Sequence, residues 1–178
     1  MCRTTLHLKL SGVLGKMLFP LFLCLFLLLE GSLVNPSTAG YEGEVAPDFE
    51  VSSLEGDYFS SFNLEGEPAL IMFWAPWCGV CRGELPKLAQ FYHDDMPDEL
   101  QVLAIGTSAP SSDVEQYVEE NPGTFIFPTA YDANRTIAGD FGIRALPTYV
   151  LLDRDGTVLL VHRGSGLMNN RKFHQLIQ

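Results

Sequence analysis

The chain has 178 residues and an excess of acidic side chains, with 22 Asp and Glu against 11 Lys and Arg and a formal net charge of −11. From residue 41 onward, 8 basic residues stand against 21 acidic ones, a net charge of −13. Such a surface repels phosphate backbones and anionic lipid headgroups, which argues against nucleic acid and peripheral membrane binding. We expect the scattered acids to keep a monomeric domain soluble.

Residues 1–40 are typical of a targeting region. Basic residues precede an apolar run at 17–29, and the first acid is Glu30. The run has the length of a signal-peptide core, but it approaches that of a membrane-spanning helix if it continues through Glu30 to residue 34. We therefore expect either a signal peptide cleaved after Ala39 or an uncleaved N-terminal anchor with a linker.

Either outcome places residues 41–178 outside the cytoplasm, in the periplasm or cell envelope, because the basic residues lie before the apolar run. This segment has the length of one domain. It contains two of the four cysteines, Cys78 and Cys81, since Cys2 and Cys24 lie in the targeting region. A disulfide that encloses two residues restricts little chain entropy, so stability is a poor reason for the pair.

Apolar periodicity and turn signals divide the domain into strands and helices. We expect strands, in chain order, at residues 46–51, 58–62, 69–74, 100–105, 125–130, 148–152 and 157–162. We expect helices from the cysteine pair to residue 92, from a Ser-Ser-Asp cap at 111–113 to residue 120, at 134–141 and at 168–177. This order indicates an α/β fold with a mixed central sheet flanked by helices and an added N-terminal β-hairpin.

The residues with the clearest chemistry are WCGVC, at 77–81, between a predicted buried strand and a predicted helix. A helix that begins at Cys78 offers unpaired backbone N–H groups and the positive end of its dipole to a thiolate, the attacking species in disulfide exchange. We therefore predict that Cys78 is the nucleophile. Cys81 lies on the same face of the first turn and is predicted to resolve the mixed disulfide.

A zinc site is the alternative for a Cys-X-X-Cys motif. A structural zinc needs about four protein ligands, and the domain has no second cysteine pair. The histidines His93, His162 and His174 lack ligand spacing and are interpreted as surface or partly buried side chains. We expect no metal and no cofactor besides the redox-active cysteine pair.

Separated motifs resemble those of the thioredoxin superfamily, namely FWAPWCGVC at 73–81 and ALPT at 145–148. APDF at 46–49, RGELP at 82–86 and the export signal are similar to the TlpA/ResA subgroup of extracytoplasmic thiol-disulfide oxidoreductases. The resemblance covers residues 45–177 and implies a thioredoxin-like fold.

The resemblance also implies a proton acceptor. Thioredoxin carries a buried acid on the strand before the motif, and the matching position here is Met72, which cannot move a proton. Glu84 occupies the position of a glutamate that lies near the active site in ResA-like proteins. One helical turn beyond Cys81, it is expected to accept the proton of that thiol.

Other positions are expected to meet the substrate or to be structural. Pro147 matches a proline that is cis in thioredoxin-like folds and lies against the cysteines, which leaves the Leu146 backbone free to pair with an extended substrate. Trp77 is expected to shield the sulfur or contact the substrate. Trp74 is expected in the core, and Pro86 is expected to kink its helix.

The resemblance implies a reductase of protein disulfides, such as those of c-type apocytochromes or of copper-site cysteines in respiratory assembly proteins, with a membrane thiol as electron donor. Gly79 and Val80 leave the direction of electron flow open. One alternative is a peroxiredoxin-type peroxidase, although Ala75 stands where those enzymes place Thr. The other is a non-enzymatic carrier that binds Cu(I) through the two thiolates.

Overall fold

The apolar run before the cysteines forms β3 (Ala69–Trp74), and all six of its residues are buried. In this computed structural model, which describes residues 42–64 and 66–178, β3 is the central strand of a five-stranded sheet of order β5-β4-β3-β6-β7. The other strands are β4 (Gln101–Gly106), β5 (Thr129–Tyr131), β6 (Thr148–Leu152) and β7 (Val158–Arg163). β3, β4 and β5 are parallel, whereas β6 is antiparallel to β3 and β7. The predicted mixed sheet is confirmed.

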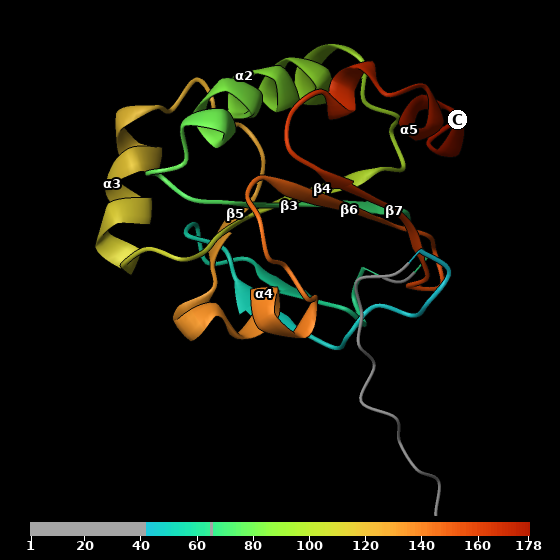
Figure 1. The fold of residues 1–178 in the computed structure, drawn as a ribbon, viewed down its shortest axis with the longest axis horizontal. Helices are drawn as coiled ribbons and strands as arrows, with labels where there is room; N and C mark the ends of the chain where they lie inside the picture. The colour runs from blue at the N-terminus through green and yellow to red at the C-terminus, as the bar shows by residue number, and fades with distance from the viewer. Residues whose placement is uncertain (1–41, 65) are drawn as a thin grey trace, which may run out of the picture. The chain divides into compact units, whose positions relative to one another are not determined.

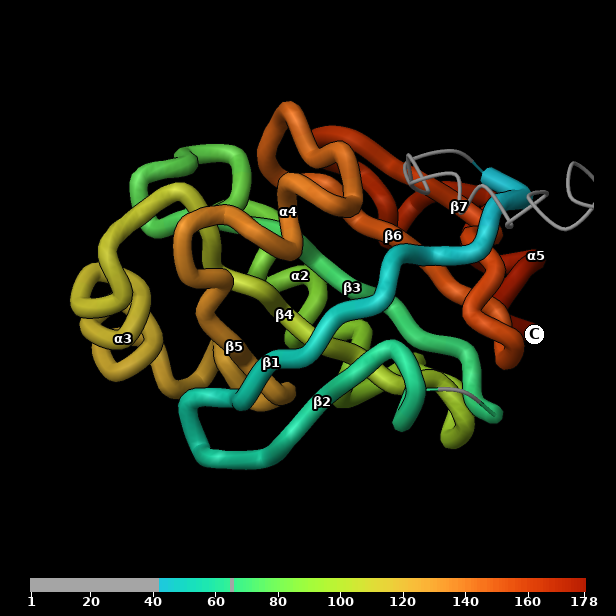
Figure 2. The backbone as a smooth tube through the Cα atoms, turned by 90° about the horizontal axis from the view of Figure 1, so that it is seen from below, coloured from blue at the N-terminus to red at the C-terminus, as the bar shows by residue number. Residues whose placement is uncertain are grey.

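Helices cover both faces of this sheet (Figure 1). One face carries α2 (Gly79–Asp94), α3 (Ser111–Glu120) and α5 (Arg171–Leu176). The other face carries α4 (Thr136–Asp140) and the predicted hairpin, which consists of β1 (Glu50–Ser52) and β2 (Tyr58–Ser60). The hairpin attaches to the edge of the sheet, since Leu54 N donates to Thr129 O at 2.8 Å (Figure 2).

Alternation along the strands divides the core into two layers, because successive side chains of a strand point to opposite faces. Met72 and Trp74 belong to the layer beneath α2, together with Cys81. Ile71 and Phe73 belong to the layer that packs against α4 and the hairpin. Trp74 is fully buried, as predicted. The end of β3, where the chain enters the cysteine motif, therefore lies on a packed core layer.

Two predicted strands begin four residues before the observed ones, and the strand predicted at 58–62 ends earlier, at Ser60. The first predicted strand, at residues 46–51, is regular only from Glu50 onward. The strand predicted at 125–130 begins later, at Thr129. Pro128 has no N–H to donate to a ladder, so regular pairing starts after it.

Three helices also differ at their ends. Pro110, rather than Ser111, is the N-cap of α3, and no side chain caps that helix. The helix predicted at 134–141 is divided, because Asn134 and Arg135 have φ of 58° and 59°, which separates a 3-10 turn at Ala133–Arg135 from α4. In the last helix Asn170 accepts from Phe173 N at 3.2 Å and caps α5, so a 3-10 turn at Leu167–Asn169 stands apart from it.

The structure describes the predicted domain but not the predicted targeting region. Residues 1–40 and the boundary after them lie outside the described residues, and so do Cys2 and Cys24. Among residues 42–64 and 66–178, the helices are all too short or too polar to cross a membrane.

Candidate functional site

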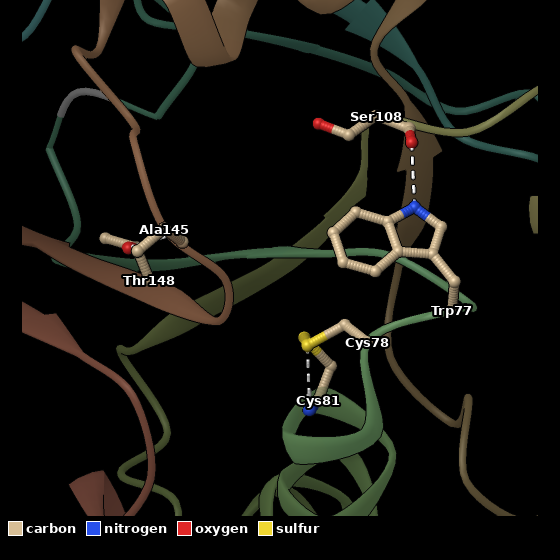
Figure 3. Close-up of a disulfide and its surroundings, with 6 residues drawn as sticks. All are labelled: Trp77, Cys78, Cys81, Ser108, Ala145 and Thr148. Atoms are coloured by element: carbon tan, nitrogen blue, oxygen red, sulfur yellow. Dashed lines mark hydrogen bonds between the residues drawn. A yellow bond between two sulfur atoms is a disulfide. The ribbon is translucent and has the colours of Figure 1, made fainter.

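The cysteine pair lies where β3 gives way to α2. Cys78 is the N-cap of α2 and is joined to Cys81 by a disulfide with a Cα–Cα distance of 5.2 Å. The Cys78 sulfur accepts a hydrogen bond from Cys81 N at 3.1 Å (Figure 3). Because the first backbone N–H groups of a helix have no partner within it, this donor is available to a negative sulfur at position 78.

The two sulfur-bearing residues differ in their access to solvent. Cys78 is 6% exposed, whereas Cys81 is completely buried. A protein disulfide can therefore approach the pair from the side of Cys78.

Pro86 lies on the exposed side of α2, and the helix continues through it.

Trp77 projects beside the disulfide (Figure 3). It is 63% exposed, and its Nε1 donates to Ser108 O at 2.8 Å. Ser108 lies in the loop after β4 with a φ of 60°. This hydrogen bond fixes one edge of a large apolar ring at the surface next to Cys78.

The turn before β6 forms the other wall of the site. The Leu146–Pro147 peptide bond is cis, as the resemblance implied. Thr148 Oγ1 donates to Ala145 O at 2.8 Å, and Figure 3 shows both residues on the side of the disulfide away from Trp77. Among the residues that the structure describes, the Leu146 amide and carbonyl have no hydrogen-bond partner. They are available to an extended polypeptide.

Glu84 lies on the same buried side of α2 as Cys81, one turn further along. It is 2% exposed. Its Oε1 is 2.7 Å from Lys87 Nζ, and its Oε2 accepts from Gly166 N at 2.8 Å. The carboxylate thus has one charged and one neutral donor, and it is held near the buried member of the cysteine pair.

Tyr149 completes this environment, and sequence reasoning missed it. The residue is 1% exposed and its hydroxyl has no hydrogen bond. Burial raises the pKa of Tyr149, and the negative charge of the neighbouring Glu84 carboxylate raises it further. Tyr149 is the cross-strand neighbour of Met72, and because this pairing depends on the register of β6 against β3, no local pattern in the sequence points to it.

The histidines fit the interpretation given to them. His93 is exposed, whereas His162 and His174 are partly buried and hydrogen-bonded to backbone carbonyls. Across residues 42–64 and 66–178, no group of three or more His, Cys, Asp or Glu side chains could hold a metal ion.

Comparison with known proteins agrees with this geometry. Residues 43–161 match the AhpC/TSA family. The chain belongs to this thioredoxin-like family. Thiol-disulfide oxidoreductase ResA of Geobacillus thermodenitrificans is 28% identical over 172 residues, which cover 97% of this chain and 91% of ResA. Thioredoxin-like protein YneN of Bacillus subtilis is 32% identical over 125 residues, which cover 70% of this chain and 72% of YneN.

Solved structures give the same result. A secreted Mycobacterium tuberculosis disulfide oxidoreductase homologous to E. coli DsbE matches with a TM-score of 0.57 and 26% identity, over 66% of this chain and 84% of that one. StoA from Bacillus subtilis, at 24% identity, shares the fold with a TM-score of 0.62, over 68% of this chain and 91% of its own. The protein is a thiol-disulfide oxidoreductase with a thioredoxin-like fold, and Cys78 and Cys81 form its disulfide.

Proposed function

We propose that this oxidoreductase reduces disulfides in target proteins outside the cytoplasm, with Cys78 as its nucleophile. The supporting observation is the position of Cys78 as N-cap of α2, with its sulfur 3.1 Å from Cys81 N. A backbone N–H and the helix dipole stabilise a thiolate at that place. The buried Cys81 is then the resolving cysteine.

The proposed reaction transfers two electrons to the target. The Cys78 thiolate attacks one sulfur of the target disulfide, forms a mixed disulfide and releases the other target sulfur as a thiolate. Glu84 takes the proton of the Cys81 thiol, and the Cys81 thiolate attacks the Cys78 sulfur. The bond from Cys78 to the target breaks, the second target sulfur leaves as a thiolate, and the disulfide of this structure is formed.

Trp77, Leu146 and Pro147 are the proposed contacts of the target segment. An extended polypeptide that hydrogen-bonds to the free backbone groups of Leu146 lies across the Cys78 side of the disulfide. The exposed Trp77 ring offers apolar area to its side chains. Backbone pairing makes such recognition tolerant of sequence.

The proposed targets are c-type apocytochromes or copper-site proteins of respiratory assembly, and the proposed electron donor is a membrane thiol protein. The basic residues and apolar run within residues 1–40 support export with or without an anchor. The Mycobacterium relative is a secreted protein. We propose residues 41–178 as the exported domain, in the periplasm or cell envelope.

Trapping tests this function directly. Cys81→Ser cannot resolve the mixed disulfide, so we expect it to accumulate covalent complexes with targets in the native cell, identified by mass spectrometry after non-reducing electrophoresis. Cys78→Ser is the matched control and should trap nothing. Complexes that form equally in both variants would remove Cys78 from the nucleophile's role.

The redox potential tests the direction of electron flow. Equilibration with a dithiothreitol or glutathione buffer should give a reducing potential, with the dithiol form able to reduce insulin. A potential near about −120 mV, typical of the strongest periplasmic oxidants, would contradict a reductase.

Two further assays test the alternatives. A peroxidase would consume hydrogen peroxide in the Cys81→Ser variant, which retains Cys78; we expect no such activity, because Ala75 offers no hydroxyl near the sulfur. A copper carrier would bind one Cu(I) tightly and fail to reduce insulin.

A further inference from the structure

The Tyr149 hydroxyl is a buried polar group without a hydrogen bond, and it lies next to a buried carboxylate. Tyr149 is 1% exposed and Glu84 is 2% exposed. Leaving a polar group buried without a partner costs about 1–3 kcal/mol, so native structures rarely retain one without a reason. Tyrosine carries its proton at neutral pH, and burial raises the pKa of Tyr149 further above its ordinary value. A neutral hydroxyl can both donate and accept a hydrogen bond.

The partners that Glu84 already has suit only its charged form. Oε1 meets the Lys87 ammonium and Oε2 meets Gly166 N–H. Both partners donate hydrogen bonds and neither can accept one. Once the carboxyl group gains a proton, its new O–H needs an acceptor. Lys87 Nζ and Gly166 N cannot supply it, whereas the neighbouring Tyr149 hydroxyl can.

Other titratable groups near Tyr149 or Glu84 already have partners. His162, on β7, has its ring centroid 6.1 Å from that of Tyr149, but its Nε2 is 3.0 Å from Ser165 O. Lys87, on α2, is paired with Glu84. Cys81, in the same core layer, is bonded to Cys78 here and is the thiol that gives its proton to Glu84 in the proposed step. Glu84 is the charged group that acts on the Tyr149 hydroxyl.

We propose that Tyr149 is a positioning residue for Glu84. While the Glu84 carboxyl group holds the proton taken from Cys81, its O–H donates a hydrogen bond to the Tyr149 hydroxyl. This inference rests on the proposed role of Glu84. The proton moves from the Cys81 sulfur to Glu84, the Cys81 thiolate attacks the Cys78 sulfur, and the target sulfur leaves with the electron pair of the broken bond. Glu84 then returns the proton to solvent or to the departing thiolate.

Tyr149→Phe tests the inference, because it removes the hydroxyl and keeps the packed ring. Without an acceptor the protonated carboxyl is disfavoured, so Glu84 becomes a weaker base. We expect the rate of oxidation of the reduced protein by insulin, in single turnover, to fall about three- to tenfold. The acidic limb of the pH–rate profile should move to lower pH. Tyr131→Phe is the matched control, since Tyr131 lies on β5 and its hydroxyl donates to Ala109 O at 3.1 Å.

Glu84→Gln separates failure of this inference from failure of the proposed function. If Glu84→Gln changes the pH–rate profile while Tyr149→Phe leaves rate and profile as they are, the inference about Tyr149 is wrong and the role of Glu84 stands. If Tyr131→Phe produces the same change as Tyr149→Phe, the effect is general to buried hydroxyls and the inference is also wrong. The inference is supported if Tyr149→Phe shifts the pH–rate profile of the otherwise unchanged protein but causes no shift when it is added to Glu84→Gln.

Discussion

Among the residues that the structure describes, two carboxylates are buried, and their surroundings differ. Asp132, 2% exposed, follows β5 and accepts from three neutral groups: Thr107 Oγ1 at 3.0 Å, Ile137 N at 2.9 Å and Ala138 N at 2.9 Å. Glu84 is equally buried, but one of its partners is a half-exposed lysine and one neighbour is a hydroxyl without a hydrogen bond.

This difference agrees with a structural role for Asp132 and with the proton-acceptor role proposed for Glu84. Asp132 ties the start of α4 to the end of β4, and each of its partners is a donor that suits the charged form. Glu84 has neighbours that suit both its charged and its protonated form, and it lies one turn from a cysteine. Burial alone therefore does not distinguish the two carboxylates; the kind of hydrogen-bond partner does.

Removing Asp132 should have the largest effect, and it should fall on stability. Asp132→Ala leaves two backbone N–H groups and the Thr107 hydroxyl buried without an acceptor. We expect the free energy of unfolding to drop by about 3 kcal/mol, measured by urea denaturation of the disulfide form. Thr107→Val removes one of the three donors and should cost about 1 kcal/mol. Disulfide exchange by the folded fraction should be unchanged; a slowed exchange would show that Asp132 is more than structural.

Replacing Glu84 should produce the opposite pattern. Glu84→Gln keeps the shape but cannot take a proton, so we expect the resolution of the mixed disulfide to slow by roughly a hundredfold, with an altered pH dependence. The free energy of unfolding should change by only about 1 kcal/mol. Stopped-flow oxidation by insulin and urea denaturation measure the two quantities. An unchanged pH–rate profile would remove Glu84 from the proposed machinery.

The lysine beside Glu84 should have a smaller effect. Lys87→Met removes a positive charge that favours the carboxylate, so the acidic limb of the pH–rate profile should move to higher pH, opposite to the shift expected for Tyr149→Phe. Because Lys87 is 53% exposed, solvent screens the pair, and we expect a loss of about 1 kcal/mol in stability. Shifts of the same sign in the two variants would contradict the arrangement described around Glu84.

The sequence predicted what depends on neighbours along the chain. The unbroken apolar run before Cys78 predicted β3, and the motif itself placed Cys78 at the start of a helix. The shift of β5 was also readable, since Pro128 cannot pair in a ladder. Glu84 was found through the family resemblance, because its spacing from Cys81 is local.

Partners far apart in the sequence could not be predicted in this way. Gly166, which donates to Glu84, lies 82 residues away, and Tyr149 reaches the site through the register of β6 against β3. Asp132 appeared as an ordinary acid because its three donors come from a loop and from α4. Register and loop geometry decide these contacts, and apolar periodicity carries no information on either.

The smallest effect should come from a third carboxylate, which lies at the surface. Glu42 pairs with Lys172 of α5, and the hydrogen bond from Lys172 holds the pKa of Glu42 below its ordinary value. Stability from this pair is therefore fully present above the ordinary pKa and is lost as pH falls through the lowered one. Lys172→Met should cost about 0.5 kcal/mol at neutral pH and less in high salt, by urea denaturation. Disulfide exchange should not change. Lys87→Met removes the same charge from beside a buried carboxylate, so it should cost more stability than Lys172→Met. The reverse order would show that burial of the acid does not strengthen its ion pair.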